Sequence, residues 1–323
     1  MGSLRFLLAC LVLLSHLGIS IVGLNPGVIA VVIFYVLAGH VVAGLWTKWQ
    51  YQPNPLICFY HDRSWRILPQ YGVAVLFATL LWLNGAQSPF LTKPPALVDW
   101  LSNLAIIPLN YFMYTGQDRF TLIPPAWSLA TEIQFYLLAP LLLSQKLSRL
   151  IICLVLSLII FVLAQYQWLD TDYYGYRLLP GILFIFIIGA LQELRHRHKA
   201  LTKSLVALGL LNALYLLWLW IWGTHRPYNS EVSLGLLIAM PLLAALSKKK
   251  LPQQSTNIGS RLNKALGALS YGVFLYHFPV IWLLKLSPPV TAPKDIIIVI
   301  ALTISCAAIG HWAIERPLWR RFR

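Results

Sequence analysis

Charged side chains are scarce in this sequence, and the two signs are unequally represented. Asp, Glu, Lys and Arg make up 11% of the 323 residues, with 10 acidic side chains against 25 basic ones. Hydrophobic residues make up 59%, and the mean hydropathy is +0.70. A soluble domain of this size needs more polar surface than such a composition supplies, so the sequence predicts a polytopic membrane protein.

Cysteine is also rare, which limits the chemistry available to the chain. Its four cysteines show no paired spacing, and three of them fall in apolar segments, so we predict neither a disulfide framework nor a metal site. The net charge of +15 would suit nucleic acid or membrane topology. Because the basic residues recur in every second loop, we favour topology and predict no nucleic-acid binding.

Long apolar runs are abundant, and ten of them approach the length of about 20 residues that crosses a bilayer as a helix. The ten predicted spans are 4–22, 25–46, 66–83, 126–143, 149–166, 178–194, 201–222, 230–247, 265–286 and 294–314. A weaker stretch, 97–112, contains several polar residues and is predicted to be re-entrant or interfacial. The predicted fold is therefore all-α, a single transmembrane domain over residues 1–323.

The basic residues set the predicted orientation, since Lys and Arg collect in short cytoplasmic loops. Basic residues follow the second, fourth, sixth, eighth and tenth spans. If 97–112 crossed the membrane, Lys146 and Arg149 would lie outside, in conflict with the loops on either side. We therefore predict that both termini are cytoplasmic.

Glu132 is a carboxylate in the middle of a long apolar segment, where a charge costs roughly 2.5 to 3.5 kcal/mol on insertion scales. Such a group normally faces a partner or a watery cavity. The most plausible partner is His16 in the first apolar run, since both lie about 9 Å below the predicted outer boundary when counted at 1.5 Å per residue. An intramembrane imidazole and carboxylate indicate proton chemistry or proton transport.

Three arginines are candidates for an anion site at the cytoplasmic side. Arg5 and His16 are eleven residues apart, which puts them on one helix face about 16 Å apart along the axis. Arg63 and Arg66 have the i, i+3 spacing that places both side chains on one side of a helix. Guanidinium groups bind phosphate in bidentate fashion, although ordinary positive-inside residues would look the same.

Six blocks of the sequence, in this order, resemble the bacterial membrane acyltransferase-3 family. They are 4–16 (LRFLLACLVLLSH), 34–39 (FYVLAG), 63–71 (RSWRILPQY), 127–136 (WSLATEIQFY), 269–277 (LSYGVFLYH) and 314–317 (IERP). Together they extend over almost the whole chain. The chain departs from the family pattern at Ile133, where a second acidic residue is common, and at Ala38, where serine is common.

The resemblance implies a ten-span O-acyltransferase of the bacterial cytoplasmic (inner) membrane. Such an enzyme moves an acyl group, usually acetyl, from cytoplasmic acyl-CoA to a hydroxyl of an envelope polysaccharide or a lipid-linked sugar. It implies no permanently bound cofactor, with acetyl-CoA as the donor substrate. By motif position, His16 and Glu132 become the catalytic residues, while Arg5, Arg63 and Arg66 become the ligands of the acyl-CoA phosphates.

The residue types fit these roles. His16 would take the proton of the acceptor hydroxyl as it attacks the thioester, and Glu132 would orient the ring and stabilise the imidazolium. Direct transfer and an acyl-histidine intermediate both remain open. The main alternative is a ten-span exporter in which His16 and Glu132 relay protons, but the long insert 84–125 has no counterpart in the second half, as an inverted repeat would require.

Overall fold

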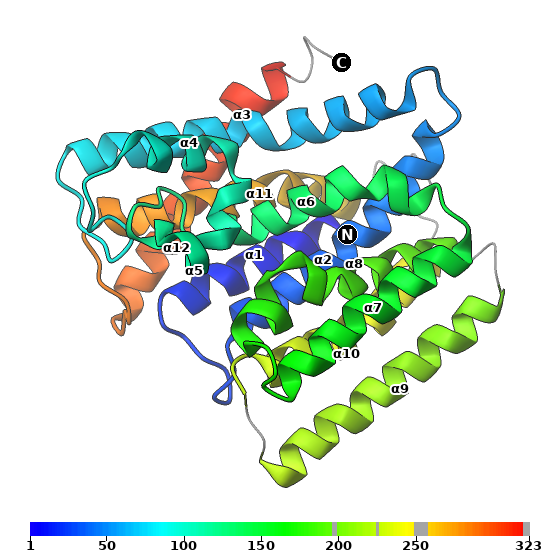
Figure 1. Ribbon diagram of the computed structural model, residues 1–323. Helices are drawn as coiled ribbons and strands as arrows, with labels where there is room; N and C mark the ends of the chain where they lie inside the picture. Colours follow the sequence, from blue (N-terminus) through cyan, green and yellow to red (C-terminus); the bar gives the residue numbers. More distant parts are fainter. Residues whose placement is uncertain (196–198, 224–225, 249–257, 319–323) are drawn as a thin grey trace. The chain divides into compact units, whose positions relative to one another are not determined.

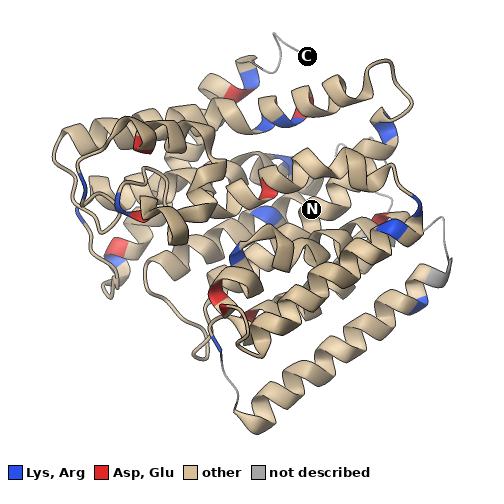
Figure 2. Cartoon of the chain, viewed as in Figure 1, with Lys and Arg blue, Asp and Glu red and all other residues tan. Residues whose placement is uncertain are grey.

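The computed structural model describes residues 1–195, 199–223, 226–248 and 258–318, and every regular element within them is a helix (Figure 1). The long helices are α1 (Gly2–His16), α2 (Pro26–Trp49), α3 (Pro55–Leu83), α6 (Ala126–Leu143), α7 (Leu147–Gln165), α8 (Leu179–Leu194), α9 (Lys199–Trp222), α10 (Asn229–Lys248), α11 (Ile258–Leu283) and α12 (Pro293–Ile309). Most of the helical ribbon carries no charged residue (Figure 2).

The predicted all-α polytopic fold is confirmed. Among the described residues, nine helices are long and apolar enough to cross a membrane, and α1 is a shorter apolar helix. Each predicted span overlaps one of the ten long helices. The largest differences in bounds are at the starts of α3 and α11, which begin at Pro55 and Ile258 where the prediction had 66 and 265.

The predicted outer end of the first span is wrong. The prediction continued to residue 22 because residues 17–22 are mostly apolar, but α1 ends at His16. Gly18 has a φ of +88°, in the left-handed region, and a Cβ at this position would meet Pro289 at 2.6 Å. The backbone therefore leaves the helix here, and His16 occupies the last position of α1 instead of lying six residues inside a span.

The stretch 97–112 forms no continuous helix. It is divided between α4 (Leu97–Ala105), the 3-10 turn η1 (Ile107–Tyr111) and the start of α5 (Phe112–Thr115), with a second 3-10 turn, η2 (Gln117–Arg119), beyond it. The nine residues of α4 extend about 14 Å, less than half of the hydrocarbon thickness. The prediction that this stretch is not a full span agrees with these lengths.

Buried polar side chains stabilise the irregular backbone of this segment. Asn103 is fully buried; its amide donates to the Phe120 carbonyl at 3.1 Å, and its oxygen accepts from the Leu122 backbone N–H at 2.8 Å. Tyr71 on α3 donates to the Asn103 carbonyl at 2.7 Å. The polar residues that weakened the hydropathy of this stretch thus satisfy the backbone groups that its irregular conformation leaves unpaired.

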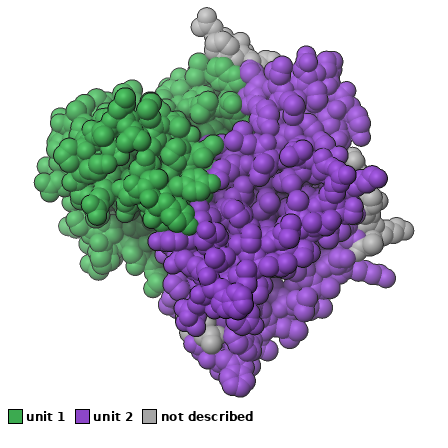
Figure 3. Space-filling model, viewed as in Figure 1, with its two compact units in different colours: residues 1–20, 62–130, 252–323 green, residues 21–61, 131–251 purple. Residues whose placement is uncertain are grey.

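The chain divides into two compact units (Figure 3). Unit 1 comprises Met1–Ser20, Asp62–Ala130 and Pro252–Arg323, and unit 2 comprises Ile21–His61 and Thr131–Leu251. In unit 1, α11 packs against both α1 and α12. In unit 2, α2 packs against α8 and α10, α7 packs against α8, and α9 packs against α10. The assignment of 1–323 to one functional domain stays a prediction.

Small residues bring α2 and α8 into close contact within unit 2. A Cβ added at Gly39 would lie 1.9 Å from the Phe186 carbonyl oxygen, and one added at Gly189 would lie 2.0 Å from the Val36 carbonyl oxygen. Neither contact is sterically possible for a larger residue without moving a backbone. As in other membrane bundles, glycine at these two positions permits the close helix approach.

Candidate active site

His16 contacts a second histidine within unit 1. Its Nδ1 lies 3.0 Å from Nε2 of His277 on α11, and the two imidazole rings are stacked, with centroids 5.0 Å apart and an interplanar angle of 12°. His277 is fully buried, whereas His16 is partly exposed at the end of α1. The close packing of α1 along α11 therefore brings together two residues that are 261 positions apart in the sequence.

The hydrogen bonds define the tautomers of this histidine pair when both rings are neutral. Nδ1 of His277 lies 3.1 Å from the Val273 carbonyl oxygen, which can only accept, so Nδ1 carries the proton. Nε2 of His277 is then the acceptor, and Nδ1–H of His16 donates to it. Nε2 of His16 consequently keeps the lone pair with which an imidazole accepts a proton.

Phenylalanine rings pack on one side of the histidine pair. The Phe278 ring lies 4.9 Å from the His16 ring and 5.1 Å from the His277 ring, centroid to centroid. Phe90, from the segment between α3 and α4, packs edge-on against Phe278 at 5.5 Å. These rings limit the access of water to one side of the pair.

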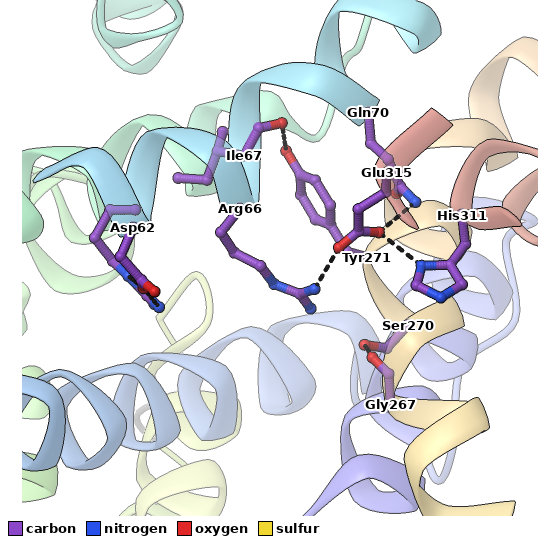
Figure 4. Close-up of polar contacts among 10 residues, drawn as sticks. Asp62, Arg66, Ile67, Gln70, Gly267, Ser270, Tyr271, His311 and Glu315 are labelled. Carbon is purple, nitrogen blue, oxygen red and sulfur yellow. Dashed lines mark hydrogen bonds and ion pairs between the residues drawn. The ribbon is translucent and has the colours of Figure 1, made fainter. Parts of the chain in front are cut away.

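Arg66 is part of a network in unit 1 that centres on a buried carboxylate (Figure 4). Its Nη1 donates to Oε1 of Glu315 at 2.8 Å, while Oε2 of Glu315 accepts from Gln70 Nε2 at 2.8 Å and lies 2.9 Å from Nδ1 of His311. Glu315 is only 4% exposed. Tyr271 fixes the neighbouring turn of α3 by donating to the Ile67 carbonyl at 3.2 Å.

The backbone beyond α12 gives Glu315 its position. Residues Gly310–Glu315 form a π-helical turn, η4, which continues α12. Such turns are rare, and they frequently occur at functional sites. Both His311 and Glu315 come from this turn.

The other two predicted anion ligands also belong to unit 1. Arg63 donates from Nε to Oδ2 of Asp62 at 3.2 Å, and a second bond joins its Nη2 to the same oxygen. Arg5 lies on α1 with His16, as predicted from their spacing. Arg63 and Arg66 are thus each paired with a carboxylate, and only the guanidinium donors beyond these bonds could bind phosphate.

Glu132 belongs to unit 2, where it lies on α6. The Tyr136 hydroxyl, one helical turn later, donates to Oε1 of Glu132. The adjacent Thr131 is fully buried, and its hydroxyl donates to the Arg177 carbonyl at 2.9 Å. This bond ties α6 to the π-helical turn η3 (Tyr173–Arg177). The pairing of Glu132 with His16 stays a prediction.

Arg177 adds a cation to this part of unit 2. Its Nε donates to Oδ1 of Asp172 at 2.8 Å, and its guanidinium lies 5.5 Å from the Tyr176 ring and 5.9 Å from the Tyr228 ring. Burial raises the pKa of the Asp172 carboxyl above its ordinary value, while Arg177 acts in the opposite direction. A partly buried carboxylate, phenols and a guanidinium therefore occur together in this part of unit 2.

The contact residues His277, His311 and Glu315 were not among the predicted site residues. His277 is the last residue of the fifth motif block, 269–277. Glu315 was noticeable as the carboxylate of the last motif block. Among the described residues, no three His, Cys, Asp or Glu side chains come together as they would to hold a metal ion.

These features first define a class: a multi-pass membrane protein with imidazole and carboxylate groups placed among its helices. The sequence of residues 2–312 matches the model of a family described as "Acyltransferase domain", acyltransferase-3. The chain belongs to this family, which confirms the resemblance and the transferase class.

Three curated relatives show how far the similarity extends. A protein of Aquifex aeolicus named "Uncharacterized protein" is 36% identical over 190 residues, which cover 58% of this chain and 81% of the relative. The "Putative peptidoglycan O-acetyltransferase YrhL" of Bacillus subtilis is 24% identical over 91% of this chain and 51% of the relative. The "O-acetyltransferase OatA" of Staphylococcus aureus is 26% identical over 92% and 53%.

The chain spans about half the length of the two O-acetyltransferases that it matches. No solved structure matched the chain.

Proposed function

We propose that this chain is a membrane O-acyltransferase that moves an acyl group, acetyl in the simplest case, from cytoplasmic acyl-CoA to a hydroxyl of an envelope polysaccharide or lipid-linked sugar. Family membership and the names of the two O-acetyltransferase relatives support this proposal. The observation that carries it is the histidine pair, which leaves a basic nitrogen on His16. The bacterial inner membrane and cytoplasmic termini are parts of the same proposal.

In the proposed reaction, Nε2 of His16 accepts the proton of the acceptor hydroxyl while the hydroxyl oxygen attacks the thioester carbonyl carbon. The C–O bond forms, the C–S bond breaks, and the CoA thiolate leaves. The imidazolium then returns its proton to the thiolate, so atoms and charge balance. General-base assistance of this kind contributes typically 10² to 10⁴-fold, roughly, to a rate.

His277 is a positioning residue in this proposal, because it acts through His16. Its Nε2 accepts from Nδ1–H of His16, which selects the tautomer and partly stabilises the positive charge when His16 is protonated. Glu132 is proposed to contribute the negative charge that the imidazolium requires.

The arginines would bind the phosphates of acyl-CoA. Arg66 has five N–H donors, and the bond to Glu315 uses one of them. Glu315 fixes the direction of the guanidinium, which reduces the conformational entropy lost when a phosphate binds. Arg5 and Arg63 have the same proposed role.

The test is transfer of label from acetyl-CoA to envelope glycan by membranes that contain the protein. We expect His16→Ala to lower transfer by about 10² to 10⁴-fold. His277→Ala should lower kcat and change its pH profile, with the KM for acetyl-CoA little changed. His61→Ala, at an exposed position on α3, is the matched control and should transfer normally. Undiminished transfer by the His16 variant, at equal protein level, would show that His16 is not the general base.

A further inference from the structure

Unit 2 contains a pocket that the acyl-transfer proposal does not use. It lies between α7, α8, α9 and α10 and has a volume of about 490 Å³. This volume falls within the range of roughly 300 to 1,000 Å³ that is usual for small-molecule sites. Leucine, isoleucine, phenylalanine and methionine side chains form most of its wall, among them Leu158, Ile188, Leu208 and Met240.

Most polar groups of the pocket lie at one end, whereas Asn212 of α9 lies between the two ends and donates to the Ser233 carbonyl oxygen at 2.8 Å. Gln165 is the last residue of α7, Asn229 is the first of α10, and Arg226 lies in the connection between α9 and α10. The Tyr215 hydroxyl of α9 donates to Oε1 of Gln165 at 2.9 Å, which links two helices at this end.

The apolar end lies deeper along the same helices. Leu158 precedes Gln165 on α7 by seven residues, and Leu208 precedes Tyr215 on α9 by seven, so each apolar residue lies about 10 Å along its helix from the polar end. On α10, Met240 is eleven residues beyond Asn229, about 16 Å along the axis. In a membrane these helices would run along the membrane normal. The pocket is therefore polar at one end of that axis and apolar further along it.

Arg226 gives the polar end a positive charge. No described residue forms a hydrogen bond or ion pair with its side chain, which is partly exposed. The nearest carboxylate in the sequence, Glu231, accepts from the backbone N–H of Asn25 at 3.2 Å and does not line the pocket. An anionic group at this end would thus meet a cation for which no described residue supplies a counter-charge.

The pocket is accessible beside α9. Leu211 lines it and is nevertheless 63% exposed. Only 11% of the apolar window of α9 is buried, so most of this helix would face hydrocarbon in a membrane. A hydrocarbon chain could therefore enter sideways from the bilayer. Free phosphate or a sugar would gain nothing from an apolar interior of this depth.

We propose that the pocket between α7, α8, α9 and α10 binds a membrane lipid with an anionic phosphate headgroup, its hydrocarbon chain among Leu158, Leu208 and Met240 and its phosphate at Arg226. The pocket geometry and the charge of Arg226 carry this proposal. It does not depend on the acyl-transfer reaction, and the lipid is not assigned as donor or acceptor.

The test uses a phosphatidylglycerol that carries a photoactivatable diazirine on its acyl chain, in phosphatidylcholine nanodiscs containing the full-length protein. Irradiation followed by peptide mass spectrometry should label α7 and α9 within 158–166 and 208–219. The same diazirine on phosphatidylcholine should label these peptides about fivefold less, as one cation near the membrane surface favours an anionic lipid by this factor.

Three variants separate the two ends of the site. Arg226→Gln should remove the preference for phosphatidylglycerol while chain labelling persists at the phosphatidylcholine level. Leu211→Trp should lower labelling by both lipids, since the larger ring fills the pocket. Leu214→Trp is the matched control, because Leu214 is 62% exposed on the same helix and does not line the pocket, and its labelling should equal that of the unmodified protein.

Two results would overturn the proposal. Equal labelling by the two lipids in the unmodified protein would contradict the preference for an anionic headgroup. Equal labelling of the Leu211→Trp and Leu214→Trp variants would contradict binding in the pocket. The size-exclusion profile of each variant verifies that it is folded. Because no readout here involves acetyl transfer, failure of this proposal leaves the proposed enzyme activity unaffected, and the reverse holds as well.

Discussion

At the scale of single residues, the Glu315 carboxylate accepts a hydrogen bond from Arg66 and so fixes the direction of the Arg66 guanidinium. We expect Glu315→Gln to raise the KM for acetyl-CoA by about tenfold or more, because hydrogen bonds to charged groups contribute roughly 1.5 to 3 kcal/mol. The change in kcat should be smaller. Initial rates at several acetyl-CoA concentrations, in membranes with equal amounts of protein, measure both parameters.

Two further variants test whether Glu315 affects the KM for acetyl-CoA by positioning Arg66. If it does, the double variant Glu315→Gln/Arg66→Gln should be no worse than Arg66→Gln alone, since interacting residues are not additive. Glu193→Gln is the control, because it makes the same Glu→Gln change at a carboxylate that does not contact Arg66. Glu193 lies in unit 2, where it pairs with His40 at 3.3 Å. Fully additive losses in the double variant would contradict a positioning role for Glu315.

The sequence predicted some of these residues and could not predict their contacts. His16 and Glu132 stood out because an ionisable group among apolar residues is costly, and the arginines stood out because their helical spacing suits an anion site. The contacts of these residues could not be predicted, because His277 is 261 residues from His16 and Glu315 is 249 from Arg66. Contacts at such separations depend on which helices pack together, and this packing is not visible in the periodicity of either helix.

At the scale of helices, the contact between α2 and α8 depends on Gly39. We expect Gly39→Val to lower the melting temperature or prevent folding, because its Cβ would overlap the Phe186 carbonyl oxygen. Overpacking of this kind costs typically about 1 to 3 kcal/mol. The melting temperature of the detergent-solubilised protein is the measurement.

Gly72→Val is the matched control for this prediction. Gly72 lies on α3, and a Cβ there would meet no atom within 4 Å. Both substitutions replace glycine by the same β-branched residue in a long helix, so the change in helix propensity is shared. Equal losses of stability in the two variants would show that close packing is not the cause.

Hydropathy was sufficient to predict that the helices exist, but not where each one ends. The first span was extended to residue 22 because apolar residues continue beyond His16. Its actual end is set by the left-handed backbone at Gly18 and by the contact with Pro289. In 97–112, by contrast, polar residues within the apolar stretch correctly indicated a segment that is not a single span.

At the scale of the whole molecule, the number of crossings determines the side of each terminus. The 15 residues of α1 extend about 22 Å, somewhat short of a hydrocarbon core of about 30 Å. Ten crossings would place both termini in the cytoplasm, as the loop charges predict. If α1 did not cross, nine crossings would place the termini on opposite sides.

Reporter fusions distinguish these two topologies. We expect green fluorescent protein to fluoresce and alkaline phosphatase to be inactive when either is fused at the N-terminus or after Arg323. A phosphatase inserted between α3 and α4 should be active, which serves as the control for export. Activity of a phosphatase at one terminus only would contradict the ten-span topology.

The π-helical turn Gly310–Glu315 has a consequence for the evolution of this protein. A π turn accommodates one more residue than an α turn, so losing a single residue here would rewind the backbone to the ordinary pitch. Every side chain after the deletion would rotate by about 100° around the helix axis. The Glu315 carboxylate would then lose its contact with the Arg66 guanidinium. Natural selection should therefore remove such deletions from functional descendants of this protein.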